Sequence, residues 1–281
     1  MSYLLLRFMP SFNPDIFWPR VLSFCQATTE QVGQKLLADF GSASPEEKED
    51  GSLVTASDQW ADAELRGAIA TTFPDHGVLS EEVEHIFPAT DWCWIIDPID
   101  GTTNFSRGIP VWGISLGLLY KGTPIFGYVY IPPIQQAYYG YWYGESGLSG
   151  PTGAFANGQP IQVRSDPPAP NQFFSLCARS THVLKSDQPF PCKIRMVGAA
   201  TYNLLLVASG VAIGAIEATP KIWDIAAVWA IVQAAGATWI ARDPDPIFPL
   251  SVGKNYGQQS FSTFVISRAD LVPTFAPWFQ A

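Results

Sequence analysis

The sequence predicts an α+β protein, with helices and an antiparallel sheet in its first half and a mixed α/β arrangement in its second. Three observations support this class. Apolar residues recur at helical spacing between residues 13 and 40. Three apolar and aromatic runs, parted by Gly- and Pro-containing turns, follow between residues 111 and 143. Beyond residue 172, short strand-like runs alternate with apolar helical runs.

The elements of the first half follow from apolar periodicity and from the positions of turn-forming residues. Asn13 and Asp15 are alternative caps for the first helix. The first half is then predicted to contain, in order, a helix reaching residue 40, a mobile acidic loop over 41–51, a helix over 59–72, a short strand over 78–82 that ends in paired acids, and three antiparallel strands over 111–119, 125–131 and 137–143.

The proline-rich segment 166–171 is predicted to connect the halves, so that residues 1–165 form an α+β half and residues 166–281 an α/β half, packed as one compact unit. The second half is predicted to contain strands over 173–177, 194–197, 214–217, 237–240 and 262–266, helices over 198–209 and 223–235, and a closing segment over 271–279.

Composition limits the classes of partner. The chain has 281 residues, of which 47% are hydrophobic and ten are tryptophan, enough for a sizeable core. A net charge of −9 argues against nucleic acid or an anionic membrane as the main partner. A phosphorylated substrate is compatible with this charge, because bound Mg²⁺ can invert the local field.

Cysteine usage and the N-terminus indicate a cytoplasmic protein. The apolar run 3–9 is short and is broken by Arg7, so we expect neither a membrane span nor a signal peptide. Met9 precedes the first helical pattern and is an alternative start to Met1. The cysteines are scattered along the chain without a C-x-x-C pair, which favours free thiols over disulfides or zinc. The four cysteines are Cys25, Cys93, Cys177 and Cys192.

A buried strand over 94–96 leads into the stretch around which the chain is organised. Pro98 and Gly101 predict that the strand stops there, because proline cannot continue the ladder and glycine permits a sharp turn. Asp97 and Asp100 are therefore placed at a strand end, and their clustered carboxylates suit Mg²⁺.

A helix is expected to open directly after these carboxylates, because Thr102, Thr103 and Asn104 are good capping residues. An exposed helix N-terminus offers unpaired N–H groups that suit a phosphate. Carboxylates beside an anion site make chemical sense only if cations lie between the like charges.

The string D-P-I-D-G-T-T-N-F at 97–105 resembles the signature of the inositol monophosphatase family, a group of Mg²⁺-dependent, lithium-sensitive phosphatases. Further family motifs follow in the expected order across about residues 50–236. They are V-T-A-S-D at 54–58, S-E-E at 80–82 with Ser80 in place of the family's glycine, G-A-A at 198–200, and W-D-I-A-A at 223–227. The resemblance implies a layered αβαβα sandwich.

The resemblance also implies a ligand set for two or three Mg²⁺ ions. Asp97 would bridge two ions. Glu81 and the carbonyl of Ile99 would complete one site, and Asp100 and Asp224 would complete the other.

The catalytic residues implied by the resemblance are Thr102, Asp58 and Glu81, with Thr102 orienting the attacking water and Asp58 supporting it. The amides of Gly101 and Thr102, beside Asp100, would hold the phosphate.

A second group of residues would contact the rest of the substrate. Gly198, Ala199 and Ala200 match the family's substrate-facing helix start, although relatives often carry Ser or Thr at the position of Ala199. Glu217 would accept a hydrogen bond from the substrate alcohol.

Several of these residues have a plainer structural interpretation. Asp58 and Asp224 stand where helix caps are common. The pair Glu81–Glu82 resembles an ordinary solvated surface pair, and Glu217 an exposed residue after a strand. The helix after Asp224 is apolar, however, so its carboxylate is expected to face the interior, where it needs a partner such as a metal.

Two other function classes are open. Residues 113–117 match the G-x-S-x-G motif of acyl hydrolases, but they lie inside an apolar run that predicts strand throughout, and only His182 follows as a possible base. A non-catalytic, metabolite-binding member of the fold is the other alternative, and the intact carboxylate set argues against it.

We expect the substrate to be a small sugar or polyol monophosphate, foremost myo-inositol 1-phosphate. Relatives act on histidinol phosphate, fructose 1,6-bisphosphate or 3′-phosphoadenosine 5′-phosphate. No basic cluster accompanies the motifs, and the loop 46–50 is acidic, so a monophosphate is favoured over a polyanion. By resemblance, a homodimer is expected.

Overall fold

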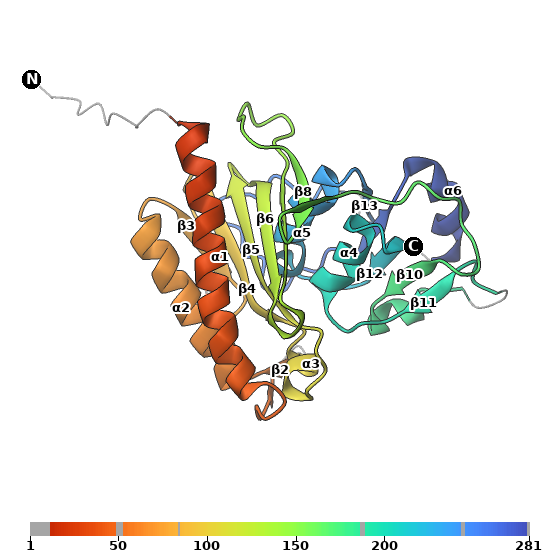
Figure 1. Cartoon of the computed structure of the whole chain (residues 1–281), viewed down its shortest axis with the longest axis horizontal. Helices are drawn as coiled ribbons and strands as arrows, with labels where there is room; N and C mark the ends of the chain where they lie inside the picture. The colour runs from red at the N-terminus through yellow and green to blue at the C-terminus, as the bar shows by residue number, and fades with distance from the viewer. Residues whose placement is uncertain (1–11, 49–52, 84, 186–188, 243–244, 280–281) are drawn as a thin grey trace, which may run out of the picture.

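Two large β-sheets alternate with three layers of helices (Figure 1). This computed structural model describes residues 12–48, 53–83, 85–185, 189–242 and 245–279. Helices α1 (Pro14–Asp39) and α2 (Ala56–Thr72) cover the outer face of a seven-stranded sheet, and α4 (Ala200–Ala208) and α5 (Ile222–Ala234) lie between that sheet and a five-stranded one. Helix α6 (Val272–Phe275) lies beyond the second sheet. The predicted αβαβα layering is confirmed.

The first sheet has the order β3-β4-β5-β6-β7-β8-β9, and all its pairs are antiparallel except β3 with β4. The antiparallel sheet predicted for residues 111–143 is thus confirmed. Its strands are β3 (Gly77–Ser80), β4 (Trp92–Asp100), β5 (Gly113–Tyr120), β6 (Thr123–Ile131), β7 (Gln136–Tyr141), β8 (Gly153–Ala156) and β9 (Gln159–Ile161).

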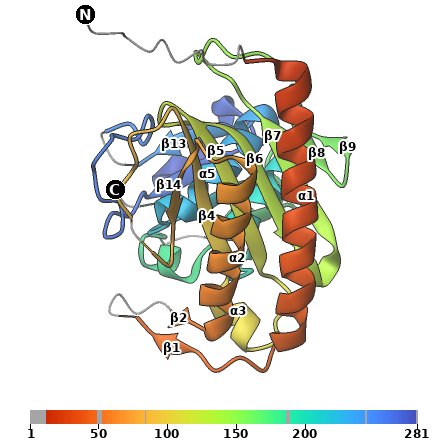
Figure 2. The same cartoon turned by 90° about the vertical axis from the view of Figure 1, so that its left-hand side faces the viewer.

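Helices α1 and α2 run side by side across this sheet (Figure 2). Asn13 caps α1 by accepting a hydrogen bond from the Asp15 amide at 3.0 Å, so the first of the two predicted caps is confirmed. Trp18, Leu65 and Trp94 are fully buried between the helices and the sheet.

The segment 41–51, which was predicted to be a mobile acidic loop, contains a short strand. Strand β1 (Glu46–Glu47) pairs antiparallel with β2 (Leu53–Val54), so the described part of this segment includes a short hairpin arm. The apolar run 3–9 and the alternative start at Met9 lie outside the described residues.

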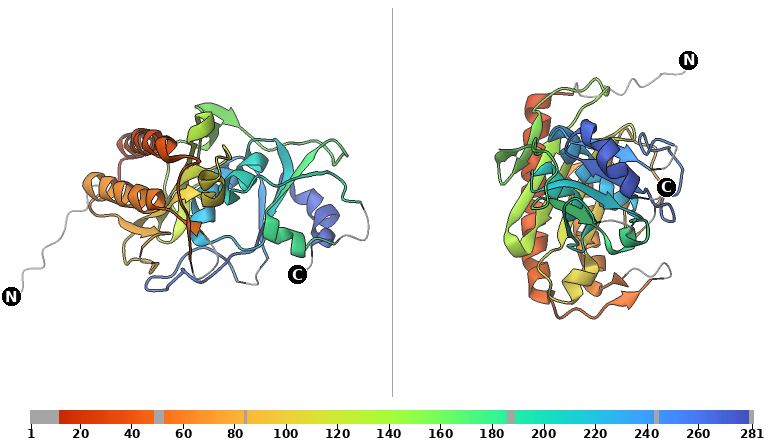
Figure 3. Two further views of the ribbon diagram at one scale, coloured as in Figure 1. Left: turned by 90° about the horizontal axis from the view of Figure 1, so that it is seen from below. Right: turned by 90° about the vertical axis from the view of Figure 1, so that its right-hand side faces the viewer.

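The second sheet has the order β11-β10-β12-β14-β13 and mixes parallel and antiparallel pairs. The left view of Figure 3 shows the second half of the chain from below, on the right of that view. The outer face of this sheet packs against α6 through a cluster of phenylalanines. The strands are β10 (Phe173–Leu176), β11 (Lys193–Arg195), β12 (Ala212–Glu217), β13 (Thr238–Ala241) and β14 (Thr263–Ile266).

Helix α5 belongs to the second half by sequence but lies directly on the backbone of the first sheet. Gly117, Gly127 and Gly140 are paired in register across β5, β6 and β7. A Cβ at Gly127 would lie 1.8 Å from the Ala227 carbonyl oxygen, and one at Gly117 would lie 2.9 Å from the Ala227 nitrogen. The three glycines therefore form a shallow seat that only residues without side chains can provide.

The division of the chain between residues 165 and 166 remains a prediction. Helix α5, from the second half, packs closely on the first sheet.

Among the described residues, no helix is both long and apolar enough to cross a membrane.

We expect Gly127→Ala to destabilise the protein, because its methyl group would force α5 away from β6. Overpacking of this kind costs about 1–3 kcal/mol in free energy of unfolding. Gly67→Ala is the matched control, because a Cβ at Gly67 on α2 would meet nothing within 4 Å. That change should stabilise the helix by up to about 1 kcal/mol. Urea unfolding of both variants decides, and equal effects would contradict the proposed seat.

Candidate active site

Three aspartates from the two halves meet between the sheets. Asp97 and Asp100 lie on β4, and Asp224 lies in the first turn of α5. One carboxylate oxygen of each lies within 4.8 Å of the others. Asp97 and Asp100 are only 1% and 5% exposed, so water cannot screen their mutual repulsion.

A β-bulge places Asp97 and Asp100 together. Asp97 pairs with Ser115 and Asp100 with Gly113, so three steps along β4 oppose two along β5. In a regular strand, residues three apart face opposite sides of the sheet, and the extra residue removes that separation. The strand was predicted to stop where Pro98 and Gly101 stand, and it does end directly before Gly101, but it does not stop at Pro98. The strand continues to Asp100, and Pro98 lies in the bulge, where its missing N–H is tolerated.

Asp100 also caps a helix of the second half. Its two carboxylate oxygens accept hydrogen bonds from the amides of Ala200 and Thr201, at 3.0 and 2.9 Å, and from the Thr201 hydroxyl. Ala199 stands at the N-cap of α4 and contributes no side-chain bond. The G-A-A segment predicted to face the substrate is therefore joined to the aspartate cluster by direct contact.

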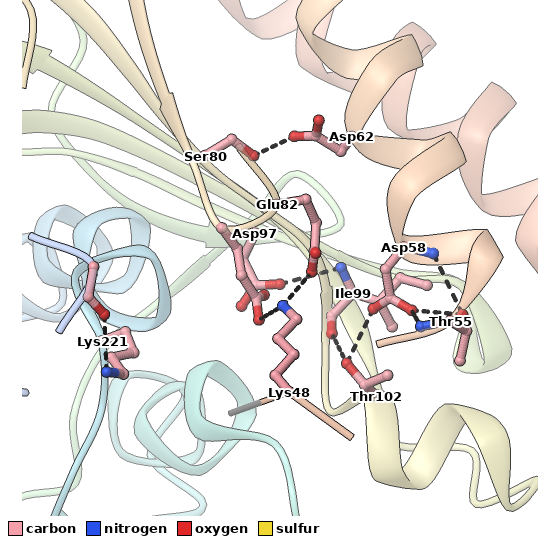
Figure 4. A network of polar contacts seen from close by, with 12 residues as sticks. Lys48, Thr55, Asp58, Asp62, Ser80, Glu82, Asp97, Ile99, Thr102 and Lys221 are labelled. Carbon is pink, nitrogen blue, oxygen red and sulfur yellow. Dashed lines mark hydrogen bonds and ion pairs between the residues drawn. The ribbon is translucent and has the colours of Figure 1, made fainter. Parts of the chain in front are cut away.

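Glu81 and Glu82 follow β3 and lie inside the site rather than on a solvated surface. The Lys48 ammonium binds both carboxylates, at 3.1 and 2.7 Å, as Figure 4 shows for Glu82. Their side chains are only 13% and 6% exposed, so the interpretation as a surface pair is wrong. Ser80, which replaces the family's glycine, is buried and donates to Asp62 on α2.

Thr102 and Asp58 form the predicted pair. The Thr102 hydroxyl lies 3.0 Å from an Asp58 oxygen and 3.1 Å from the Ile99 carbonyl (Figure 4). Asp58 also accepts from the Thr55 amide at 2.7 Å, in a capping box at the start of α2, so it is a helix cap as well.

The short helix α3 (Thr102–Ser106) begins differently from its prediction. Gly101 is its N-cap, in a left-handed conformation with φ of 90°, and no side chain caps the helix. The Thr102 hydroxyl is thereby left to bind Asp58.

Asp224 is both a helix cap and a member of the cluster. One of its oxygens accepts from the Lys221 amide at 2.7 Å. Its helix is buried along most of its length, as the apolar sequence predicted.

Glu217 is 3% exposed at the end of β12, so its interpretation as a surface residue is wrong. Asn203 donates to it at 2.6 Å, and Asn203 in turn accepts from the Ser175 hydroxyl. Burial raises the pKa of Glu217 well above its usual range, and the nearby Cys177 raises it further.

The cluster carries raised pKa values throughout. Burial, opposed by Lys48, raises the pKa of Glu81 to about 8. Burial and then Asp100 raise the pKa of Asp224 to about 7. Burial followed by Glu81 raises the pKa of Asp97 well above its ordinary value. Such a group of oxygen donors fits a hard divalent cation, because the cation would offset the repulsion that otherwise favours protonation.

Sequence reasoning missed four contacting residues. Asp62 lies one helical turn after Asp58, so its spacing could have indicated a shared face. Thr201 directly follows the G-A-A motif, and Asn203 lies within one turn of it. Lys48 comes from a loop and carries no signal in the sequence.

Ser115 of the G-x-S-x-G motif lies in the middle of β5. It is fully buried, and its hydroxyl has no hydrogen-bond partner among the described residues. A nucleophile elbow requires an exposed serine at a strand-to-helix turn. The geometry therefore gives no support to acyl hydrolysis.

Comparisons with known proteins agree with the motifs. The family model described as Inositol monophosphatase family matches residues 19–263. The chain is 32% identical over 262 residues to the inositol-1-monophosphatase of Synechocystis sp., covering 88% of each protein. It is 32% identical over 217 residues to the histidinol-phosphatase of Chlorobaculum parvum, covering 74% of this chain and 80% of that one. Among solved structures, it resembles the IMPase of Thermotoga maritima, with a TM-score of 0.72 and 28% identity over 90% of this chain and 94% of that one.

The raised pKa values predict how the metal-free protein responds to pH. Folded Glu81 and Asp224 keep their protons up to about pH 8 and 7, whereas in the unfolded chain they lose them near about pH 4. Between these limits the folded state binds more protons, so the free energy of unfolding falls as pH rises. We expect the melting temperature in EDTA to fall between about pH 5 and pH 8.

Saturating Mg²⁺ should flatten this fall, because a bound cation keeps the same carboxylates ionised. Thermal unfolding with EDTA or Mg²⁺ across the range is the measurement. A melting temperature in EDTA that rises toward pH 8 would contradict the assigned shifts.

Proposed function

Because the chain belongs to the inositol monophosphatase family, whose members are phosphoric monoester hydrolases, we propose that it is a Mg²⁺-dependent phosphatase of small polyol monophosphates. The expected substrate is myo-inositol 1-phosphate. The observation that carries this proposal is the convergence of Asp97, Asp100 and Asp224 within 4.8 Å, beside the Thr102–Asp58 pair.

The carboxylates of the cluster would hold the cations, with Glu81 and the Ile99 carbonyl as further oxygen donors. Bound Mg²⁺ supplies an activated water and stabilises the charge that develops on the leaving oxygen. The protein's own contribution begins with the bulge on β4, which presents two carboxylates and a carbonyl from one short stretch.

Thr102 is proposed to orient the attacking water. Its hydroxyl proton is committed to Asp58 or to the Ile99 carbonyl, so its oxygen is available to accept a hydrogen bond from the water. Asp58 is fixed by the capping box at Thr55 and keeps the hydroxyl in this orientation. The amides of Gly101 and Thr102 would donate to the phosphate.

Glu217 is proposed to bind a substrate hydroxyl away from the phosphorus. Its burial and its bond from Asn203 hold the carboxylate in one position. A buried carboxylate also suits a protonated amine, so histidinol phosphate is the second candidate, as the similarity to a histidinol-phosphatase suggests. By family resemblance we also expect inhibition by Li⁺ at the site that Asp224 completes, and a homodimer.

The function is tested with a panel of phosphate esters and with two charge-removing variants. Wild-type protein should release inorganic phosphate with Mg²⁺ and stop in EDTA. Asp97→Asn and Asp224→Asn should each reduce kcat by more than the roughly 10–100-fold that is typical when a residue that only orients a metal ligand is removed. Asp75→Asn, on an exposed turn, is the control and should keep wild-type turnover. Full turnover in EDTA or in either cluster variant would disprove the metal-dependent scheme.

Glu217→Ala should separate specificity from chemistry. A hydrogen bond from the substrate hydroxyl contributes about 1.5–3 kcal/mol when the Glu217 carboxylate is ionised. The loss of kcat/KM for inositol 1-phosphate should therefore be about ten- to a hundredfold. The loss for p-nitrophenyl phosphate should be small, because this substrate has no such hydroxyl. Equal losses on both substrates would assign Glu217 to the metal site or to stability, and no loss on either would remove it from the active site.

A further inference from the structure

His85 lies between the two halves of the candidate active site, four residues after Glu81. Its Nε2 donates to the backbone carbonyl of Glu81 at 2.9 Å. The Glu81 amide donates to the Ile96 carbonyl at 3.2 Å, so both backbone groups of this residue are held.

The face of the same imidazole ring lies on Trp223. The two ring centres are 5.0 Å apart and the planes differ by 27°, which is a stacked arrangement. Trp223 is 6% exposed and directly precedes Asp224 on α5. One ring therefore contacts the backbone of one proposed metal ligand, Glu81, and the residue next to another, Asp224.

The long connection between β13 and β14 packs against the segment that carries this ring. The Tyr256 amide donates to the His85 carbonyl at 3.0 Å, and Phe87 exchanges two backbone hydrogen bonds with Gly253 and Lys254. Gly257 lies so close that a Cβ there would be 2.5 Å from the His85 Nδ1 atom.

The same connection also reaches the other side of the site. The Lys221 ammonium donates to the Gly257 carbonyl at 3.0 Å, and the Lys221 amide donates to the Asp224 carboxylate. The connection thus holds the histidine segment and the start of α5 against one another.

We propose that His85 is a positioning residue that sets the Glu81 carboxylate at a fixed distance from Asp224. It does so with a hydrogen bond at one edge of its ring and with Trp223 against its face. The inference rests on the proposed metal-dependent function, because the distance matters only if both carboxylates hold cations. Outer residues that orient metal ligands typically change metal affinity by about 10–100-fold when they are removed.

The test measures Mn²⁺ binding to the full-length protein by electron paramagnetic resonance, which reports free Mn²⁺ directly. His85→Ala should raise the Kd for Mn²⁺ on the order of tenfold. It should also raise the Mg²⁺ concentration needed for half-maximal turnover more than it lowers kcat at saturating Mg²⁺. His85→Gln keeps a donor and His85→Phe keeps the stacking face, so each should restore part of the affinity.

His76→Ala is the matched control. His76 stacks on Trp92 with ring centres 5.6 Å apart and accepts from the Trp94 indole at 3.1 Å, but it lies on the outer side of the first sheet. Its removal costs a similar set of contacts and should lower the melting temperature without changing the Kd for Mn²⁺. A second control is the Glu81→Gln background, in which His85→Ala should have no further effect on Mn²⁺ affinity.

An unchanged Kd in His85→Ala, with wild-type protein binding Mn²⁺ and hydrolysing phosphate esters, would overturn the role of His85 and leave the proposed function intact. An equal rise in Kd for His76→Ala would also overturn it, because the effect would then be general loss of stability. Wild-type protein that neither binds Mn²⁺ nor hydrolyses any ester would overturn the proposed function, and the role of His85 with it.

Discussion

Repulsion among buried carboxylates is the constraint on which the architecture of the site depends. Asp97, Asp100, Asp224 and Glu81 approach one another where water cannot screen them, and burial drives their pKa values upward. A folded chain can tolerate such a group only if other contacts hold the carboxylates in place. The structure supplies those contacts from the backbone: a bulge on β4, the amides at the start of α4, and the Lys221 amide before α5.

These contacts join the two halves of the chain at the cluster of aspartates, where the carboxylates repel one another. Asp100 belongs to the first sheet and caps a helix of the second half, while Asp224 belongs to a helix that rests on the first sheet. The first half therefore caps a helix of the second half, and the second half supplies a helix that covers the first sheet. Separation of the halves would expose the end of a helix and leave charged groups without partners, so the site and the packing of the layers depend on the same bonds.

The order of most elements could be predicted from sequence, because periodicity and turn residues are local signals, whereas the layering was implied by the family resemblance. The motifs also indicated which residues to look for, and the structure brings Asp97, Asp100 and Asp224 together and pairs Thr102 with Asp58, although the strand and helices that carry them begin or end elsewhere than predicted. The continuation of β4 through Pro98 could not be predicted, since proline interrupts a strand unless a bulge accommodates it. The burial of Glu217 and the reach of Lys48 depend on contacts between distant segments, and no local pattern encodes these contacts.

The glycine seat under α5 has a consequence for how this enzyme can diverge. Because the helix rests on main chain at Gly117, Gly127 and Gly140, its height above the sheet does not depend on which side chains fill the surrounding core. Core substitutions can accumulate through evolution while Asp224 stays at the same depth. The three glycines cannot easily be replaced one at a time, since a methyl group on one strand would tilt α5 relative to the other two strands. New substrate preferences are therefore expected to arise in the loops around the site, such as the β13–β14 connection, with the helix that carries the carboxylate left in register.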